Sequence, residues 1–297
     1  MTAVSTAQLP SASLGPRPIA PKEFRRFQAW ILKETGIHLT DAKQALLVGR
    51  LWKRVKELGL PDYAAYLDLV EVGGDKEEGV RLINAICTHE TQFFREPRQF
   101  EYLEEELVPR WRLLADQGRR TRKVRVWSAA CSSGEEPYSV GMSLLTHLPS
   151  SDGWSVEIVA TDLSTNILDR ARAGIYPMAR AESIPTTYLK RYMLKGRGEQ
   201  EGKFAVGPEL RSAVSFRQIN LQKGPFDTFG LFDLILCRNV LIYFTGEGRV
   251  GVLSALTHQL APGGRLFLGH AETLNGLTHK LRTVVPTVYA SPELHDR

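Results

Sequence analysis

The sequence predicts an α/β protein in which a small all-α domain precedes a doubly wound, mostly parallel sheet. Two observations predict this fold class. Apolar residues have helical spacing without strand alternation up to about Thr91, and strands alternate with helices after Arg122. A third feature is the stretch between about residues 174 and 211, which this alternation does not need. We interpret it as an inserted β-hairpin subdomain.

The N-terminal domain is expected to span residues 21–92 and to contain four helices. Phe24, Phe27 and Ile31 have helical spacing, and Pro21 suits a first helical turn. The other helices are predicted from a cap at Asp41 to about Leu58, over 62–71, and over 77–88.

The sheet domain is expected to cover residues 124–297, after a connecting region at 93–123. This region combines a charged helical stretch from about Pro97 to Ala115 with a linker at Gly118–Lys123. Strands are predicted at Val124–Trp127, Val156–Ala160, Val214–Gln218, Phe232–Cys237, Arg265–Leu268 and Val284–Tyr289. Helices are predicted at Pro137–Leu148, Ser164–Ala173 and Gly246–Leu260.

Composition and charge limit the class of protein without naming it. Three cysteines without paired spacing favour a reduced, cytoplasmic protein, and no apolar run approaches the roughly 18 residues of a membrane helix. A net charge of +5 indicates an acidic partner, which from charge alone is nucleic acid, a membrane surface or an acidic protein. Residues 1–20 lack a basic start followed by an apolar core, so we expect a disordered tail and no signal peptide.

The most informative stretch is VWSAACSSGEEPYS at residues 126–139. An apolar strand leads into small residues, a glycine, and two acids at the start of a helix, Glu135 and Glu136. Ligands of such sheets bind beyond the carboxyl ends of the strands, where helix N–H groups favour an anion. Two carboxylates there would repel a dinucleotide pyrophosphate, so we expect a cationic cofactor without phosphate, such as S-adenosylmethionine. The alternative is that both acids only complement the helix dipole.

A further acid, Asp162, ends the next predicted strand. In dinucleotide-binding folds an acid at this place binds ribose hydroxyls. Taken alone, Asp162 is more typical of a helix cap. Together with the loop at 126–139, it favours ribose binding.

Five separated stretches resemble the CheR family of chemotaxis receptor methyltransferases, in the order that this family has them. They are Thr88–Glu96, Trp127–Tyr138, Ala160–Asp162 with Ala173–Tyr176, Cys237–Phe244, and Gly269–Glu272. The resemblance extends from about residue 20 to 290. It implies a class I methyltransferase-like fold, S-adenosyl-L-methionine as methyl donor and S-adenosyl-L-homocysteine as product. It also implies that glutamates of methyl-accepting chemotaxis receptors are converted to methyl esters for sensory adaptation.

The resemblance also implies roles for individual residues. Thr91 and Arg95 match residues that cover the cofactor, with Arg95 near its carboxylate and the reaction centre. The other matches are Glu135 as the loop acid, Asp162 at the ribose, Asn220 and Leu221 on the adenine side, Arg238 and Asn239 facing the cofactor, and Tyr243 at the methyl-transfer region. Many members have Asn where this chain has His89, and because imidazole can also donate a hydrogen bond, we expect His89 to allow binding.

A glutamate substrate explains why no general base is evident. Its carboxylate, with a pKa of roughly 4.3, is already a nucleophile at neutral pH. The reaction destroys charge, so a site that excludes water and aligns the reacting atoms supplies much of the acceleration. Arg95 and Tyr243 are therefore expected to position the reactants, and no metal is expected.

A basic face of the second predicted helix is expected to dock the receptor. Lys43, Arg50 and Arg54 share this face, and the family's corresponding helix meets acidic receptor helices. A solvated basic face is the alternative. The partners implied are the cytoplasmic domains of chemoreceptors. We expect a monomer, without nucleic-acid binding or membrane insertion.

The turn Lys195–Lys203 is expected to be shaped by Gly196, Gly198 and Gly202. From the residues alone an ordinary hairpin loop is favoured. The turn nevertheless resembles the β-subdomain loop of family members that bind a C-terminal receptor pentapeptide.

Three other functions compete with this interpretation. A nucleic-acid methyltransferase fits the charge, but the Asn/Asp-Pro-Pro-aromatic loop of base methylation is replaced by Asn239-Val240-Leu241. An NAD-dependent oxidoreductase is disfavoured by the acidic loop. A non-catalytic signalling module is disfavoured by the matches at Arg95, Asp162 and Tyr243, and a turnover assay decides it.

Overall fold

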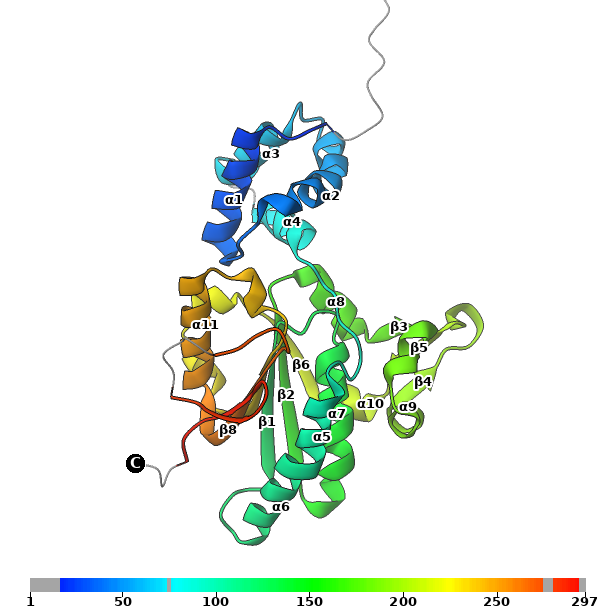
Figure 1. Cartoon of the computed structure of the whole chain (residues 1–297). Coiled ribbons are helices and arrows are strands. Elements are labelled where there is room, and N and C mark those ends of the chain that lie inside the picture. Colours follow the sequence, from blue (N-terminus) through cyan, green and yellow to red (C-terminus); the bar gives the residue numbers. More distant parts are fainter. Residues whose placement is uncertain (1–16, 74–75, 275–279, 294–297) are drawn as a thin grey trace, which may run out of the picture. The chain divides into compact units, whose positions relative to one another are not determined.

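The computed structural model describes residues 17–73, 76–274 and 280–293 and divides into two compact units. The helical unit holds the described residues up to Trp30 together with Thr40–Ile86. The sheet unit holds Ile31–Leu39 and the described residues from Cys87 onward. The elements of each unit are labelled in Figure 1.

The helical unit is built from the four helices that the sequence predicts. They are α1 (Pro21–Thr35, whose last turn belongs to the sheet unit), α2 (Gln44–Glu57), α3 (Tyr63–Glu71) and α4 (Lys76–Ile86). Phe27, Leu47, Leu51, Val55 and Tyr66 are fully or almost fully buried in it, so the apolar stripe of α2 is a core stripe.

The predicted cap at Asp41 is wrong. Asp41 begins a 3₁₀ turn, Asp41–Lys43, that precedes α2, and its carboxylate accepts a hydrogen bond from Gln28 Nε2 at 3.0 Å. Thr40 occupies the N-cap position, without a side-chain cap. The carboxylate is therefore engaged by a neighbouring helix rather than by N–H groups of its own.

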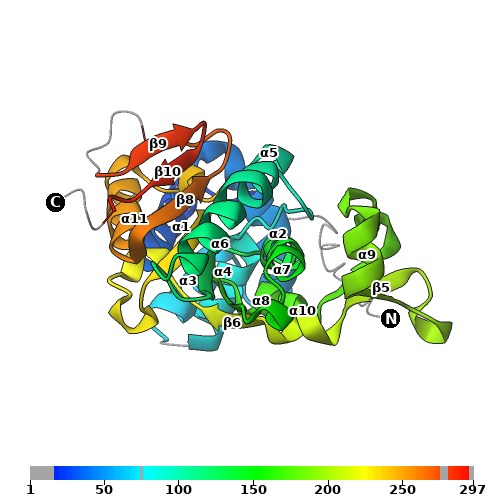
Figure 2. The same cartoon turned by 90° about the horizontal axis from the view of Figure 1, so that it is seen from below.

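The sheet unit contains a seven-stranded sheet with the order β6-β2-β1-β7-β8-β10-β9. Its strands are β1 (Lys123–Ala129), β2 (Ser155–Asp162), β6 (Val214–Gln218), β7 (Phe232–Cys237), β8 (Leu260–Leu268), β9 (Arg282–Val285) and β10 (Val288–Ala290). The strands β6, β2, β1, β7 and β8 are parallel to one another, whereas β10 is antiparallel to both β8 and β9. In Figure 2 the strands β8, β10 and β9 lie side by side at one edge.

Helices cover both faces of this sheet, as the alternating pattern predicts. One face packs on α11 (Gly246–His258), with Trp127, Ile235 and Leu266 in the interface. The other packs on α7 (Glu135–His147) and on the connecting helices α5 (Pro97–Tyr102) and α6 (Val108–Asp116), with Val126 and Leu234 in the interface. A mostly parallel sheet buried on both faces is the doubly wound class.

The connecting helix is interrupted between α5 and α6. The backbone from Leu103 to Leu107 takes a π-helical turn, and Pro109 follows in the first turn of α6. Because proline has no N–H, it removes a regular helical hydrogen bond at this place, and a wider turn accommodates the loss.

Of the three remaining α-helices in the described residues, the first packs on β2 and β6 of the large sheet, and the other two flank the insert. In chain order the three are α8 (Thr165–Ala173), α9 (Thr186–Tyr192) and α10 (Pro208–Ser212). The insert is a three-stranded antiparallel sheet of order β3-β5-β4, formed by β3 (Ile175–Pro177), β4 (Met193–Lys195) and β5 (Lys203–Val206). The predicted hairpin is its β4–β5 pair, and β3 is additional.

The last predicted strand, Val284–Tyr289, is in fact a hairpin. β9 ends at Val285 and β10 begins at Val288, because Pro286 cannot donate to a ladder and Thr287 has a φ of 64°. Among the described residues, no helix is both long enough and apolar enough to cross a membrane.

Candidate active site

Backbone strain is concentrated beyond the carboxyl ends of the central strands. Ala130 and Ser132 follow β1, Asn239 follows β7, and Phe94 and Glu96 lie in the connecting segment; all five have a φ between 50° and 66°. In the described residues only Thr287 is a further non-glycine residue with positive φ. Such conformations are costly and tend to gather at functional sites.

The loop after β1 turns sharply into α7. Gly134 has a φ of 97°, and a Cβ built on it would lie 3.0 Å from Tyr176 Oη and 3.1 Å from the Ala171 Cβ. Tyr176 Oη also donates to the carbonyl of Ser133 at 2.7 Å. Only glycine fits here, and the turn places Glu135 and Glu136 in the first turn of α7.

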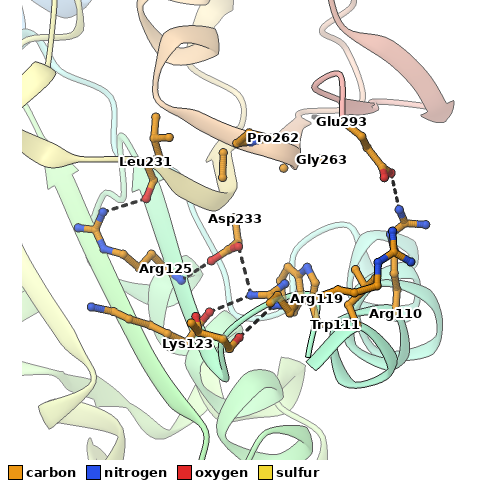
Figure 3. Close-up of a pocket in the computed structure, with 15 residues that line it drawn as sticks. Arg110, Trp111, Arg119, Lys123, Arg125, Leu231, Asp233, Pro262, Gly263 and Glu293 are labelled. Atoms are coloured by element: carbon orange, nitrogen blue, oxygen red, sulfur yellow. Dashed lines mark hydrogen bonds and ion pairs between the residues drawn. The ribbon is translucent and has the colours of Figure 1, made fainter. Parts of the chain in front are cut away.

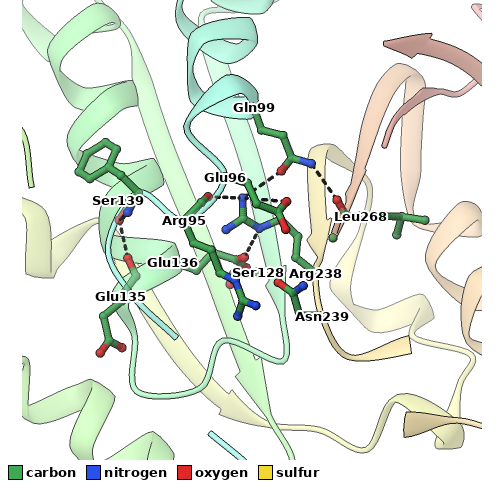
Figure 4. A network of polar contacts seen from close by, with 12 residues as sticks. Arg95, Glu96, Gln99, Ser128, Glu135, Glu136, Ser139, Arg238, Asn239 and Leu268 are labelled. Atoms are coloured by element: carbon green, nitrogen blue, oxygen red, sulfur yellow. Dashed lines mark hydrogen bonds and ion pairs between the residues drawn. The ribbon is translucent and has the colours of Figure 1, made fainter. Parts of the chain in front are cut away.

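The two glutamates have different partners. Glu136 accepts hydrogen bonds from Ser128 Oγ and from Arg238 Nε, each at 2.7 Å. Glu135 accepts one from Ser133 Oγ at 2.6 Å, and its carboxylate points away from this network in Figure 4. The acid that is available to a ligand is therefore Glu135, since Glu136 neutralises a buried arginine.

Arg238 joins the connecting segment to the sheet (Figure 4). Its Nη1 donates to the carbonyl of Arg95 at 2.8 Å and to Gln99 Oε1 at 2.9 Å. Gln99 Nε2 donates in turn to the carbonyl of Leu268 at 2.7 Å. The side chain of Arg238 is only 2% exposed, so its guanidinium serves this network.

Asp162 lies at the end of β2 and orders the loop after β1. Its carboxylate accepts from the backbone N–H of Ser132 at 2.9 Å and of Ser164 at 3.0 Å. Burial raises the pKa of Asp162, and these N–H groups and the nearby His89 oppose that rise. His89 and Asp162, predicted as cofactor contacts, are thus neighbours.

Arg95 and Tyr243 are also brought within electrostatic reach of each other. Burial raises the pKa of the Tyr243 hydroxyl, Glu90 raises it further, and Arg95 lowers it. Arg95 Nη1 donates to the carbonyl of Glu90 at 3.1 Å. The carbonyl of Thr91 accepts from Arg180 Nη1 at 2.6 Å, which attaches the connecting segment to the insert.

Asn220 and Leu221 follow β6 as the sequence predicts. Asn220 Oδ1 accepts from the backbone N–H of Gln222 at 3.0 Å, and its Nδ2 donates to the carbonyl of Glu34 at 2.8 Å. Leu221 is buried. The side chain of Asn220 shapes the local turn, and its contact with an adenine stays a prediction.

Glu272 is a site residue whose role the sequence does not reveal. Its carboxylate accepts from the backbone N–H groups of Asn239, Leu241 and Gly269 at 2.7–2.8 Å. The loops after β7 and β8 are thereby held together. Glu96 and Gln99 were missed as well. Their only sequence signal is that Glu96 ends the Thr88–Glu96 stretch and that Gln99 follows three residues later.

The predicted docking residues belong to the helical unit. Arg54 forms an ion pair with the buried Glu78, whose Oε2 lies 3.1 Å from Arg54 Nε. Arg50 Nη1 donates to the carbonyl of Ala85 at 2.9 Å. Lys43 closes the 3₁₀ turn before α2. Arg50 and Arg54 thus also connect α2 to α4.

The three glycines in the turn of the insert are required for two different reasons. A Cβ on Gly196 would lie 2.0 Å from the carbonyl oxygen of Gln200, so this position admits no side chain. Gly198 and Gly202 face open space but have φ values of 59° and 77°. The turn between β4 and β5 therefore depends on all three.

The residues around the first loop fit a cationic nucleoside. Glu135 and Asp162 provide two buried carboxylates, which favour an ammonium and ribose hydroxyls and disfavour phosphate. Ser132 Oγ is buried and makes no hydrogen bond with the described residues. No group of three or more His, Cys, Asp or Glu side chains in the described ranges is arranged to hold a metal.

A doubly wound sheet with two buried carboxylates beyond the carboxyl ends of β1 and β2 is the arrangement expected of the class of S-adenosylmethionine-dependent methyltransferases. Family models agree: "CheR methyltransferase, SAM binding domain" matches residues 89–290, and "CheR methyltransferase, all-alpha domain" matches residues 22–87. The chain belongs to the CheR methyltransferase family.

Full-length relatives support this assignment. The chain is 39% identical to "Chemotaxis protein methyltransferase 2" of Pseudomonas aeruginosa over 91% of this chain and 92% of that protein. It is 37% identical to the Salmonella typhimurium "Chemotaxis protein methyltransferase" and 38% identical to that of Escherichia coli, in each case over 92% of this chain and 91% of the relative.

Proposed function

We propose that this CheR-family protein transfers the methyl group of S-adenosylmethionine to glutamate side chains of chemotaxis receptors, forming methyl esters. The observation that carries the proposal is the pair of buried acids, Glu135 and Asp162, beyond the carboxyl ends of β1 and β2 in a family whose sheet domain binds this cofactor. The names of the relatives supply the chemotaxis context.

The cofactor is held by side chains from several loops in this proposal. Glu135 pairs with its ammonium, Asp162 accepts from its ribose hydroxyls, and Arg95 meets its carboxylate. The other contacts that we propose are His89, Thr91, Asn220, Leu221 and Asn239. When bound, S-adenosylmethionine supplies an electrophilic methyl group on a sulfonium.

Arg95 and Tyr243 position the glutamate that receives the methyl group. Because burial raises the pKa of Tyr243, its hydroxyl stays protonated at neutral pH and acts as a hydrogen-bond donor. Arg95 attracts the carboxylate of this substrate glutamate and takes no proton from it. The nucleophile is already ionised, so exclusion of water and alignment are what these residues contribute. Arg238 acts indirectly, because it fixes the main chain of Arg95.

The helical unit is proposed to dock the receptor through Lys43 and Arg50, with Arg54 at the edge of the same face. Arg50 is exposed and Lys43 is half-buried. The ion pair of Arg54 with Glu78 supports a mainly structural contribution, because Glu78 is buried and breaking this pair removes its shortest charged contact, while the longer one to Arg81 at 3.4 Å remains. Docking is therefore tested at Lys43 and Arg50.

The insert is proposed to bind the C-terminal tail of tailed receptors. Strand β4 is the last strand of its sheet, so a peptide can add along its edge. Leu194 on β4 is 57% exposed, which gives an apolar contact. Five basic residues against two acids, between Lys190 and Lys203, suit a peptide carboxylate.

Two variants separate these surfaces in a paired experiment. Gly198→Val should strain the turn, because valine disfavours a φ of 59°, and should abolish tail binding. It should leave methylation of a tail-less receptor fragment unchanged. Lys43→Glu with Arg50→Glu should slow methylation of tailed and tail-less fragments alike, by about tenfold. Initial rates of methylation are measured for the wild type and both variants on each fragment. Equal rates for these three proteins would contradict both assignments.

The reaction itself is tested by peptide mass mapping. A purified receptor cytoplasmic fragment, incubated with the protein and S-adenosylmethionine, should gain one methylene mass only on peptides whose modified residue is glutamate. Methylation of lysine or arginine instead would contradict the proposal.

A further inference from the structure

A pocket of about 560 Å³ lies at the amino ends of the central strands. It is bounded by the starts of β1, β7 and β8, by α6, and by the linker at Arg119–Thr121 (Figure 3). The candidate active site lies beyond the carboxyl ends of the same strands. Because β1 has seven residues, roughly 20 Å of strand separates the two regions.

Cationic side chains dominate the lining of this pocket. They are Arg110, Arg119, Arg120, Lys123 and Arg125. The acids in the lining are Asp233 and Glu293, and Lys123 and Arg125 share a third carboxylate, Glu157, outside it. The cations exceed these carboxylates by two.

One of the guanidinium groups is held rigidly. Arg120 Nη2 donates to Asp233 Oδ1 at 3.2 Å and to the carbonyl of Lys123 at 2.8 Å. The same guanidinium lies 5.2 Å from the ring centre of Trp111, and burial lowers the pKa of Arg120. A fixed and partly desolvated cation binds an anion more strongly than a mobile, hydrated one.

Arg119, unlike Arg120, is not held by neighbouring side chains in the described part of the chain. Its guanidinium makes no hydrogen bond or ion pair with the residues that the structure describes, although Arg119 lines the pocket. Arg110 pairs with Glu293, and both side chains are more than 40% exposed. Within the described part of the chain, Arg119 is thus a lining cation without a partner, and Arg110 can exchange its exposed partner for a ligand.

We propose that this pocket binds a phosphorylated small molecule of about nucleotide size, independently of the methyl-transfer site. Guanidinium forks match the geometry of phosphate oxygens, and two excess cations suit a diphosphate. The volume is that of a small-molecule site. Leu231, which is 50% exposed, and Pro262 provide an apolar side for a ring.

The alternative partner is a nucleic acid. It would need a basic track that extends along the surface, whereas these cations converge on one concave site. The pocket therefore favours the small ligand, and an oligonucleotide belongs among the probes of the test.

Calorimetry with the full chain tests the proposal. Pyrophosphate, ADP, inorganic phosphate and a random oligonucleotide are titrated at matched ionic strength. We expect ADP and pyrophosphate to bind and saturating S-adenosylhomocysteine to leave that binding unchanged. Tighter binding of ADP than of pyrophosphate would show that the ring is also recognised. Arg119→Gln should weaken binding by about tenfold or more, because it removes one charge-assisted contact.

Arg112→Gln is the matched control. Arg112 lies on α6, as Arg110 does, and pairs with Asp152, but it does not line the pocket. Its replacement should leave the affinity for ADP unchanged. The proposal is overturned if neither ADP nor pyrophosphate binds, if Arg119→Gln and Arg110→Gln both bind normally, if S-adenosylhomocysteine displaces the ligand, or if the oligonucleotide binds more tightly than ADP.

Discussion

Replacing Asp162 by alanine is expected to weaken binding of S-adenosylmethionine and S-adenosylhomocysteine by about a hundredfold. The carboxylate lies at the end of β2 and, in the proposed site, accepts hydrogen bonds from two ribose hydroxyls. Hydrogen bonds to a charged group contribute about 1.5–3 kcal/mol each, and two of them correspond to at least this factor. The loop after β1 also loses the acceptor for Ser132 N–H and Ser164 N–H, which adds to the effect.

The pH dependence of cofactor affinity provides a second readout for the same variant. Burial raises the pKa of Asp162, so the folded protein binds a proton there more readily than the unfolded chain does. As pH falls through this raised pKa, protonation stabilises the free protein but removes an acceptor from the ribose. Affinity should therefore begin to fall at a higher pH than for an ordinary aspartate, and Asp162→Ala should lack this step.

A matched control for Asp162 is available on the next helix. Asp169 on α8 is a 71% exposed carboxylate that pairs with Arg172. Asp169→Ala removes the same charge without changing the loop after β1 or the end of β2, so calorimetry should show wild-type affinity. If Asp162→Ala also binds normally, the assignment of the ribose contact is wrong.

The second large effect is expected at the buried pair of Arg238 and Glu136. Their side chains are 2% and 10% exposed, and Arg238→Met leaves the carboxylate of Glu136 without its partner. Breaking such a pair lowers the free energy of unfolding by about 3–5 kcal/mol. The main chain of Arg95 also loses its hydrogen bond, so kcat should fall in the protein that remains folded.

A double-mutant cycle separates stability from catalysis. Adding Glu136→Gln to Arg238→Met removes the unpaired charge, so chemical denaturation should show that much of the lost stability returns. The kcat should stay low, because the contact with Arg95 is still missing. Arg265→Met, at a buried arginine that donates to Tyr102 Oη, should lower stability without changing kcat. Recovery of kcat in the double variant would contradict a positioning role for Arg238.

The fold class was predictable because its signals are local. Alternating apolar runs and small-residue turns marked β1, β2, β6 and β7, and these strands lie within three residues of the predicted ranges. The exceptions had weaker signals. Strand β3 has three residues, which is too short for alternation to be recognised. Pro286 marks the break before β10, but the apolar residues on both sides of it have the pattern of one continuous strand.

The site was only partly predictable, because its polar contacts join distant parts of the chain. Glu135 and Glu136 are neighbours in the sequence, and nothing local shows that Glu136 pairs with Arg238, 102 residues away. The same is true of Gln99, which reaches Leu268. Arg54 belonged to a basic face in the helical pattern, yet Glu78 on α4 engages it. Residue type and spacing predict which elements carry function, whereas pairing across elements appears only in the fold.

Transfer of a labelled methyl group to receptor membranes tests the proposed function most directly. The protein is incubated with S-adenosylmethionine labelled in the methyl group and with chemoreceptor-containing membranes from its own organism, and the membranes are then treated with alkali. The structure and the family predict labelled receptors that release volatile methanol, the product of a hydrolysed methyl ester, and a strongly reduced yield with Asp162→Ala. Label that resists alkali, or that enters nucleic acid instead of receptors, would contradict glutamate methylation.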